Sequence, residues 1–79
     1  MYYVYILQSK LDQSRYIGVT TDLRRRLQEH NAGSAIYSNK KRPYQIVWYC
    51  AFVDKKKAYE FERYLKSSSG YAFTKKHLI

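Results

Sequence analysis

The chain has 79 residues, and its 15 lysines and arginines against six acidic residues give a formal charge of +9. This length suits one domain, spanning residues 1–79, and is too short for two. A single cysteine, Cys50, excludes an internal disulfide and a cysteine-based metal cluster. The apolar runs are far shorter than the about 18 residues of a membrane span, and the first residues lack the basic region and cleavage site of a signal peptide. A cytoplasmic location is expected.

The excess positive charge, with a sequence pI of about 9.8, indicates a polyanionic partner. Nucleic acid is the first candidate and an acidic membrane surface the second. Plain solubility is the remaining interpretation of such a charge. Walker, zinc and dinucleotide-binding motifs are absent from the sequence, so no small-molecule cofactor is expected.

The first 19 residues predict a β-hairpin. Tyr2 to Gln8 is rich in aromatic and β-branched residues, and residues 15–19 have the same character. The polar segment from Lys10 to Ser14 is short enough for a hairpin connection.

A helix is predicted directly after the hairpin. Asp22 is a candidate N-cap, together with the two threonines before it. Leu23 and Leu27 then lie four residues apart, on one helical face. Asn31 to Gly33 predicts the end of this helix.

The second half of the chain predicts a strand and one or two further helices. Residues 44–52 are apolar at consecutive positions, which predicts a strand buried on both faces. Asp54 is a candidate cap for a helix whose apolar stripe comprises Ala58, Phe61 and Leu65. Residues 67–70 predict the end of this helix, and residues 71–79 a short terminal helix.

The order strand, strand, helix, strand, helix predicts an α+β domain with a small three-stranded sheet flanked by helices. A right-handed crossover makes the third strand parallel to the second. The sheet is fully antiparallel only if the first strand is central, and this is the arrangement that we expect.

Glu62 is an acidic residue beside the apolar stripe of its helix, whereas Glu60 points away. An inward carboxylate requires a cation, a hydrogen-bond donor or a metal ion. A salt bridge to one of the many basic residues is the ordinary explanation, and metal ligation is the alternative.

Arg26 and His30 are neighbours on the first predicted helix because they are four residues apart. Arg26 flanks the apolar face and could bind a phosphate, while Arg24 and Arg25 would attract a nucleic-acid backbone at longer range. The alternative is a row of solvated arginines. For His30, a structural role at the helix end is favoured over proton transfer.

Gly18 shares a face of the second strand with Tyr16, and a glycine there indicates close approach of another backbone or a ligand. Lys40, Lys41 and Arg42 form a basic loop that fits either phosphate contacts or a solvated surface.

Four elements of the chain resemble the GIY-YIG nucleases, specifically the short stand-alone bacterial branch. Tyr3-Val4-Tyr5 and Tyr16-Ile17-Gly18, separated by ten residues, are similar to the two motifs that name the family. The segment 21–27 resembles the helix with the family arginine, at Arg26, and the segment 58–66 resembles the helix with the metal-binding glutamate, at Glu62.

The resemblance implies hydrolysis of a DNA phosphodiester with one divalent ion, Mg²⁺ or Mn²⁺, held by Glu62. It implies that Tyr5 activates water, that Tyr16 orients the water or a phosphate oxygen, and that Arg26 binds the scissile phosphate. It implies that His30 assists proton transfer. Double-stranded or branched DNA, in repair or recombination, is the implied substrate.

The chain departs from the family pattern in two places. Tyr3 replaces the first glycine of the first motif, and an asparagine found in many relatives after the metal-binding helix has no counterpart. Targeting would come from the domain itself, a protein partner or the shape of branched DNA. A non-catalytic nucleic-acid-binding module and a small basic structural protein are the competing hypotheses.

Overall fold

A computed structural model of the chain describes residues 1–32 and 41–79. Three strands form an antiparallel sheet in the order β2-β1-β3: β1 (Tyr2–Ser9), β2 (Arg15–Thr20) and β3 (Tyr44–Phe52). The helical segments are α1 (Leu23–Asn31), α2 (Lys55–Leu65), α3 (Ser68–Phe73) and a terminal π-helical turn, η2 (Thr74–Leu78). The predicted α+β fold with the first strand at the centre is confirmed. No helix in the described ranges is long and apolar enough to cross a membrane.

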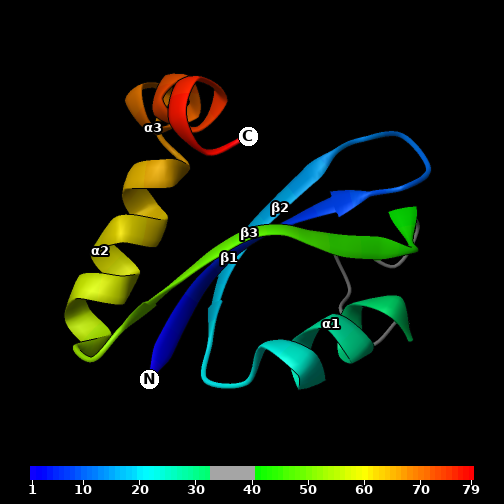
Figure 1. Ribbon diagram of the computed structural model, residues 1–79, viewed down its shortest axis with the longest axis horizontal. Coiled ribbons are helices and arrows are strands. Elements are labelled where there is room, and N and C mark those ends of the chain that lie inside the picture. Colours follow the sequence, from blue (N-terminus) through cyan, green and yellow to red (C-terminus); the bar gives the residue numbers. More distant parts are fainter. Residues whose placement is uncertain (33–40) are drawn as a thin grey trace.

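The helices lie on the two sides of the sheet, with α1 on one side and α2 and α3 on the other (Figure 1). Because side chains alternate along a strand, β1 supplies both cores. Tyr5 and Leu7 pack with Leu27 of α1. Val4 packs with Leu65 of α2.

The helix starts follow the predicted caps. The Asp22 carboxylate accepts a hydrogen bond from the Arg25 backbone N–H at 3.1 Å, and Asp54 accepts one from Lys56 at 2.8 Å. The prediction for residues 67–70 is only partly right, because α2 ends at Leu65 and Ser67 caps a new helix, α3. The terminal helical region therefore begins before residue 71.

The prediction that the third strand is buried on both faces is wrong. β3 is an edge strand, because β1 pairs with both other strands and takes the centre. Trp48, Cys50 and Phe52 pack on the α2 side, whereas Tyr49 on the opposite face is 56% exposed. The Tyr49 ring instead meets Tyr3 edge-on at 6.2 Å between centroids. The aromatic residue at position 49 is therefore explained by its cross-strand pair with Tyr3, on a face of the sheet that is partly exposed to solvent.

Candidate active site

Tyr5 and Gly18 face each other on paired strands, β1 and β2. The Tyr5 side chain lies across Gly18, and a Cβ atom at position 18 would collide with the phenol hydroxyl. Tyr5 is 1% exposed. A close approach at Gly18 is present, but the approaching group is a tyrosine ring and not the backbone or ligand that was predicted. This contact fixes where the phenol hydroxyl lies.

Arg26 of α1 reaches the same hydroxyl. Its Nε donates a hydrogen bond to Tyr5 Oη at 3.3 Å, and its Nη1 contacts Glu29 Oε1 at 3.2 Å. Glu29 also pairs with Arg25 at 3.3 Å. The Arg26 side chain nevertheless remains 41% exposed, so part of its guanidinium is open to a ligand. Sequence reasoning gave Glu29 no role, although its spacing from Arg25 and Arg26 is that of helical ion pairs.

The Tyr5 phenol holds its proton more tightly than a free tyrosine. Burial raises the pKa of Tyr5 above 10, while the hydrogen bond and the charge of Arg26 act to lower it. The charges of Tyr16 and Glu62 raise the pKa further by smaller amounts. Side chains from β2, α1 and α2 therefore act on one phenol of β1.

His30, at the end of α1, is 1% exposed. Its ring packs among three tyrosine rings, with centroid distances of 4.8 Å to Tyr16, 5.9 Å to Tyr44 and 6.4 Å to Tyr5. Burial lowers the pKa of His30, and the Arg26 charge lowers it further, against a smaller opposing effect of Glu29. The imidazole is therefore neutral at pH 7.

Asn31 anchors the end of α1 to β3 and was missed by sequence reasoning. Its side-chain amide donates to the Tyr44 carbonyl at 3.2 Å, and its oxygen accepts from the Tyr44 N–H at 2.6 Å. This pair of hydrogen bonds holds the turn of α1 that carries His30. The sequence indicated only that Asn31 lies at the end of a helix, and this gave no signal for its contact with β3.

Glu62 lies on α2 with its side chain 19% exposed, while Glu60 is fully on the exposed side. The carboxylate forms an ion pair with Lys66 Nζ at 3.1 Å. It is also close enough to Tyr5 for its charge to affect that phenol. The salt bridge to a basic residue that the sequence offered as the ordinary explanation for Glu62 is therefore present. Sequence reasoning did not identify Lys66 as the partner, although a Glu–Lys spacing of four residues favours such a pair.

A groove of about 390 Å³ separates the first turns of α1 and α2. Arg25 and Arg26 line it from α1, and Lys55 and Tyr59 line it from α2. Glu62 follows Tyr59 by three residues, so it continues the same face of α2 beyond the groove. Asp22 and Glu29 also line the groove, so its walls carry charges of both signs.

The predicted nucleic-acid-binding residues are divided between two places. Arg24 and Arg25 are exposed on α1, and Arg25 lines the groove. Lys41 pairs instead with Asp12 of the β1–β2 connection at 3.4 Å. Arg42 is exposed beside it, and Lys40 lies outside the described residues.

Comparison with known proteins gives a consistent family. The model of the GIY-YIG catalytic domain matches residues 1–76. A UPF0213 protein of Streptococcus pneumoniae is 42% identical over 65 residues, which are 81% of this chain and 65% of that protein. A UPF0213 protein of Haloquadratum walsbyi is 42% identical over 67 residues, covering 84% of this chain and 74% of that protein.

The solution NMR structure of a UPF0213 protein from Bacillus halodurans has a TM-score of 0.58 and 36% sequence identity. The match covers 96% of this chain and 84% of that one. The name UPF0213 states no activity, whereas the domain model describes a nuclease-type catalytic domain. The chain belongs to the GIY-YIG catalytic domain family.

Proposed function

We propose that this chain is a metal-dependent DNA endonuclease that hydrolyses a phosphodiester bond. The observation that carries the proposal is the contact between Arg26 and Tyr5, at 3.3 Å, beside an open groove. The guanidinium is held at one edge by the phenol and by Glu29, yet it stays partly exposed. An arginine fixed in this way is preorganised to bind a phosphate.

The donor set fits a hydrated ion held by one carboxylate. Among the described residues, no group of three or more His, Cys, Asp or Glu side chains is placed to hold a metal. Glu62 is half-buried and negatively charged beside Tyr5, and Mg²⁺ keeps several waters when one or two carboxylates bind it. Glu62 would hold the ion in exchange for Lys66. A bound Mg²⁺ or Mn²⁺ would supply charge that polarises the phosphate and stabilises the leaving oxygen.

The protein residues have separate tasks in this proposal. Arg26 binds the non-bridging oxygens of the scissile phosphate and stabilises their charge in the transition state. Tyr5 is protonated at neutral pH because its pKa is raised, so its hydroxyl donates a hydrogen bond to the attacking water or a phosphate oxygen. Tyr16 helps to orient the water. His30, whose pKa is lowered by burial, is neutral at pH 7 and would assist proton transfer.

A non-catalytic nucleic-acid-binding module is the second candidate. The ion pair between Glu62 and Lys66 favours it, because a paired carboxylate is already neutralised without a metal. The two candidates share the groove and differ only in phosphodiester cleavage.

Nicking of supercoiled plasmid separates these two candidates. Purified protein is incubated with plasmid, a branched DNA junction and single-stranded RNA, each with Mg²⁺, Mn²⁺ or a chelator. Glu62→Gln keeps the size of the side chain and removes its charge, so we expect metal-dependent nicking to fall at least about a hundredfold. DNA affinity, measured by fluorescence anisotropy in chelator, should change by less than about twofold, since Glu62 contacts no phosphate in this proposal and its ion pair with Lys66 contributes little.

Glu60→Gln is the matched control, because Glu60 lies on the exposed face of the same helix. It should nick like the wild type. Equal nicking by Glu62→Gln and Glu60→Gln would show that Glu62 does not hold the ion. Binding without nicking by any form of the protein would establish the non-catalytic module instead.

A further inference from the structure

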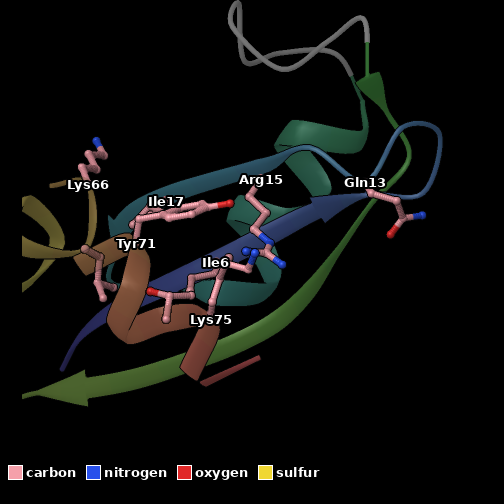
Figure 2. Close-up of a pocket in the computed structure, with 9 residues that line it drawn as sticks. Ile6, Gln13, Arg15, Ile17, Lys66, Tyr71 and Lys75 are labelled. Carbon is pink, nitrogen blue, oxygen red and sulfur yellow. The ribbon is translucent and has the colours of Figure 1, made fainter. Parts of the chain in front are cut away.

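A second and larger pocket, of about 550 Å³, lies near the C-terminal end of α2, between the sheet and the terminal helices. Ile6, Ile17 and Leu65 form its apolar floor. Arg15 borders it from β2 and Lys75 from η2 (Figure 2). This volume is within the range of pockets that hold small organic ligands, about 300–1,000 Å³.

The charges around this pocket have one sign. Arg15, Lys66 and Lys75 line it, and no carboxylate does so among the described residues. Figure 2 shows the Arg15 and Lys75 side chains reaching toward each other from opposite walls. Neither forms an ion pair with any acidic group that the structure describes. Two cations brought together without a carboxylate repel each other, and an anion between them removes that repulsion.

Tyr71 gives the pocket an aromatic wall. It is 59% exposed, and Lys75 Nζ lies 5.6 Å from its ring centroid. In Figure 2 the ring lies across the pocket with its hydroxyl toward Arg15. An apolar floor, an aromatic wall and a cationic rim are the features that bind a base and its phosphate together.

We propose that this pocket binds an unpaired nucleotide of the nucleic-acid strand. Arg15 and Lys75 hold its backbone phosphate, and its base lies against Tyr71 and the apolar floor. The cationic rim and apolar floor complement a single nucleotide, and a volume of about 550 Å³ is that of a small-ligand site and not of a surface for a base-paired duplex. The inference rests on the proposed function for its ligand class, and adds a requirement for unpaired substrate.

Lys66 connects this pocket with the candidate active site. It lines the pocket and also pairs with Glu62 at 3.1 Å. The Lys66 side chain therefore extends from the pocket, where a strand would be held, to the carboxylate proposed to hold the metal ion. The pocket would thus position an unpaired region next to the bond that is cut.

The test compares two adjacent lysines. Lys75→Gln and Lys76→Gln remove the same charge from the same turn, but only Lys75 lines the pocket. Binding of a labelled single-stranded oligonucleotide and of the matching duplex is measured by fluorescence anisotropy in chelator, from about 50 to 200 mM salt, where phosphate contacts show their salt dependence. For the single strand, Lys75→Gln should weaken binding about fivefold and reduce the salt slope by about one, as expected for one lost phosphate contact.

Tyr71→Ala should weaken single-strand binding about tenfold without changing the salt slope, because stacking does not release counterions. Tyr71→Phe should bind like the wild type. Lys76→Gln should change affinity by less than about twofold, as for a charge at the rim. Circular dichroism and urea unfolding of each variant identify any loss of folding.

The inference is overturned if Lys75→Gln and Lys76→Gln bind the single strand alike, or if duplex binding shows the same losses. It is also overturned if free mononucleotide binds as tightly as the oligonucleotide, since the pocket would then serve a small molecule. These measurements need no cleavage. If the lysine variants differ as expected but no form of the protein nicks DNA, only the proposed nuclease activity is refuted. If the protein nicks DNA but the two lysine variants bind the single strand alike, only the nucleotide pocket is refuted.

Discussion

Tyr5 and His30 have proton affinities shifted in opposite directions by the same surroundings. Burial favours the neutral form of each group, which raises the pKa of the phenol and lowers the pKa of the imidazole. Arg26 opposes the first shift and adds to the second. At pH 7 the pair therefore consists of a hydrogen-bond donor and a proton acceptor. Two titratable groups whose pKa values are shifted apart by their surroundings are typical of acid–base sites.

The low pKa of His30 predicts that the protein loses stability in mild acid. Unfolding exposes His30 and returns its pKa to about 6.5, so below that pH the unfolded chain binds a proton that the folded chain resists. The contribution of His30 is therefore fully present above pH 6.5 and is lost as the pH falls through and below that value. We expect the midpoint of urea unfolding to fall as the pH is lowered from 7.5 to 5.5.

His77, the other histidine, provides the control because it is exposed. His77→Gln should keep the decline, and His30→Gln should flatten it even though it lowers stability overall. A decline of equal slope in both variants would assign the acid sensitivity to another group.

The junction of α2 and α3 depends on a close approach of backbones. Gly70 sits against the Tyr64 carbonyl and the Leu65 backbone, and an added Cβ would overlap these atoms. The hydroxyl of Ser67 accepts the Gly70 N–H at 3.1 Å and caps α3 at the same point. The chain can therefore turn sharply after α2 and return η2 to the sheet.

Gly70→Ala is expected to destabilise the domain. Alanine is favoured over glycine within a helix by about 1 kcal/mol, but the overlap here is with backbone, which cannot move aside as a flexible side chain can. Overpacking of this kind costs about 1–3 kcal/mol, so we expect a net loss of about 1–2 kcal/mol in urea unfolding. Ser69→Ala, at the exposed neighbouring position, should be close to wild type. Equal stability of the two variants would contradict a tight junction.

At the scale of the whole molecule, the charge of +9 sets the strength of its long-range attraction for nucleic acid. Some of the basic residues are neutralised internally: Arg25 and Arg26 share Glu29, Lys41 pairs with Asp12, and Lys66 pairs with Glu62. The other lysines and arginines of the described segments form no ion pair, and together with the open part of Arg26 they are available to contact phosphates.

Nucleic-acid affinity should therefore depend steeply on salt. Six or more phosphate contacts would reduce affinity about a thousandfold between about 50 and 200 mM salt. Anisotropy titrations with one duplex over this range measure the slope. An affinity that hardly changes with salt would show that the basic residues do not contact the backbone.

The sequence predicts the arrangement of elements well, because caps such as Asp22 and the apolar stripe of α2 are local signals. The burial of β3 was misjudged because the exposure of each face depends on where the helices cover the sheet, which a run of apolar residues does not reveal. The nearness of Tyr5 and Arg26, 21 positions apart, came from family resemblance and not from spacing. Glu29 and Lys66 were missed because an ion pair on a helix surface looks like ordinary charge patterning.

The ammonium group of Lys66 stands where a dissolved cation would otherwise approach Glu62. In the proposed enzyme it is a tethered competitor that every incoming ion has to displace. An exposed ion pair contributes about 0.2–1 kcal/mol, so displacement raises the ion concentration needed for half-occupancy by roughly one and a half to five times. Divalent ions overcome this threshold more readily than monovalent ones, since their attraction to the carboxylate is twice as large. Lys66 would thus favour divalent over monovalent ions by charge alone, independently of how the ion is coordinated.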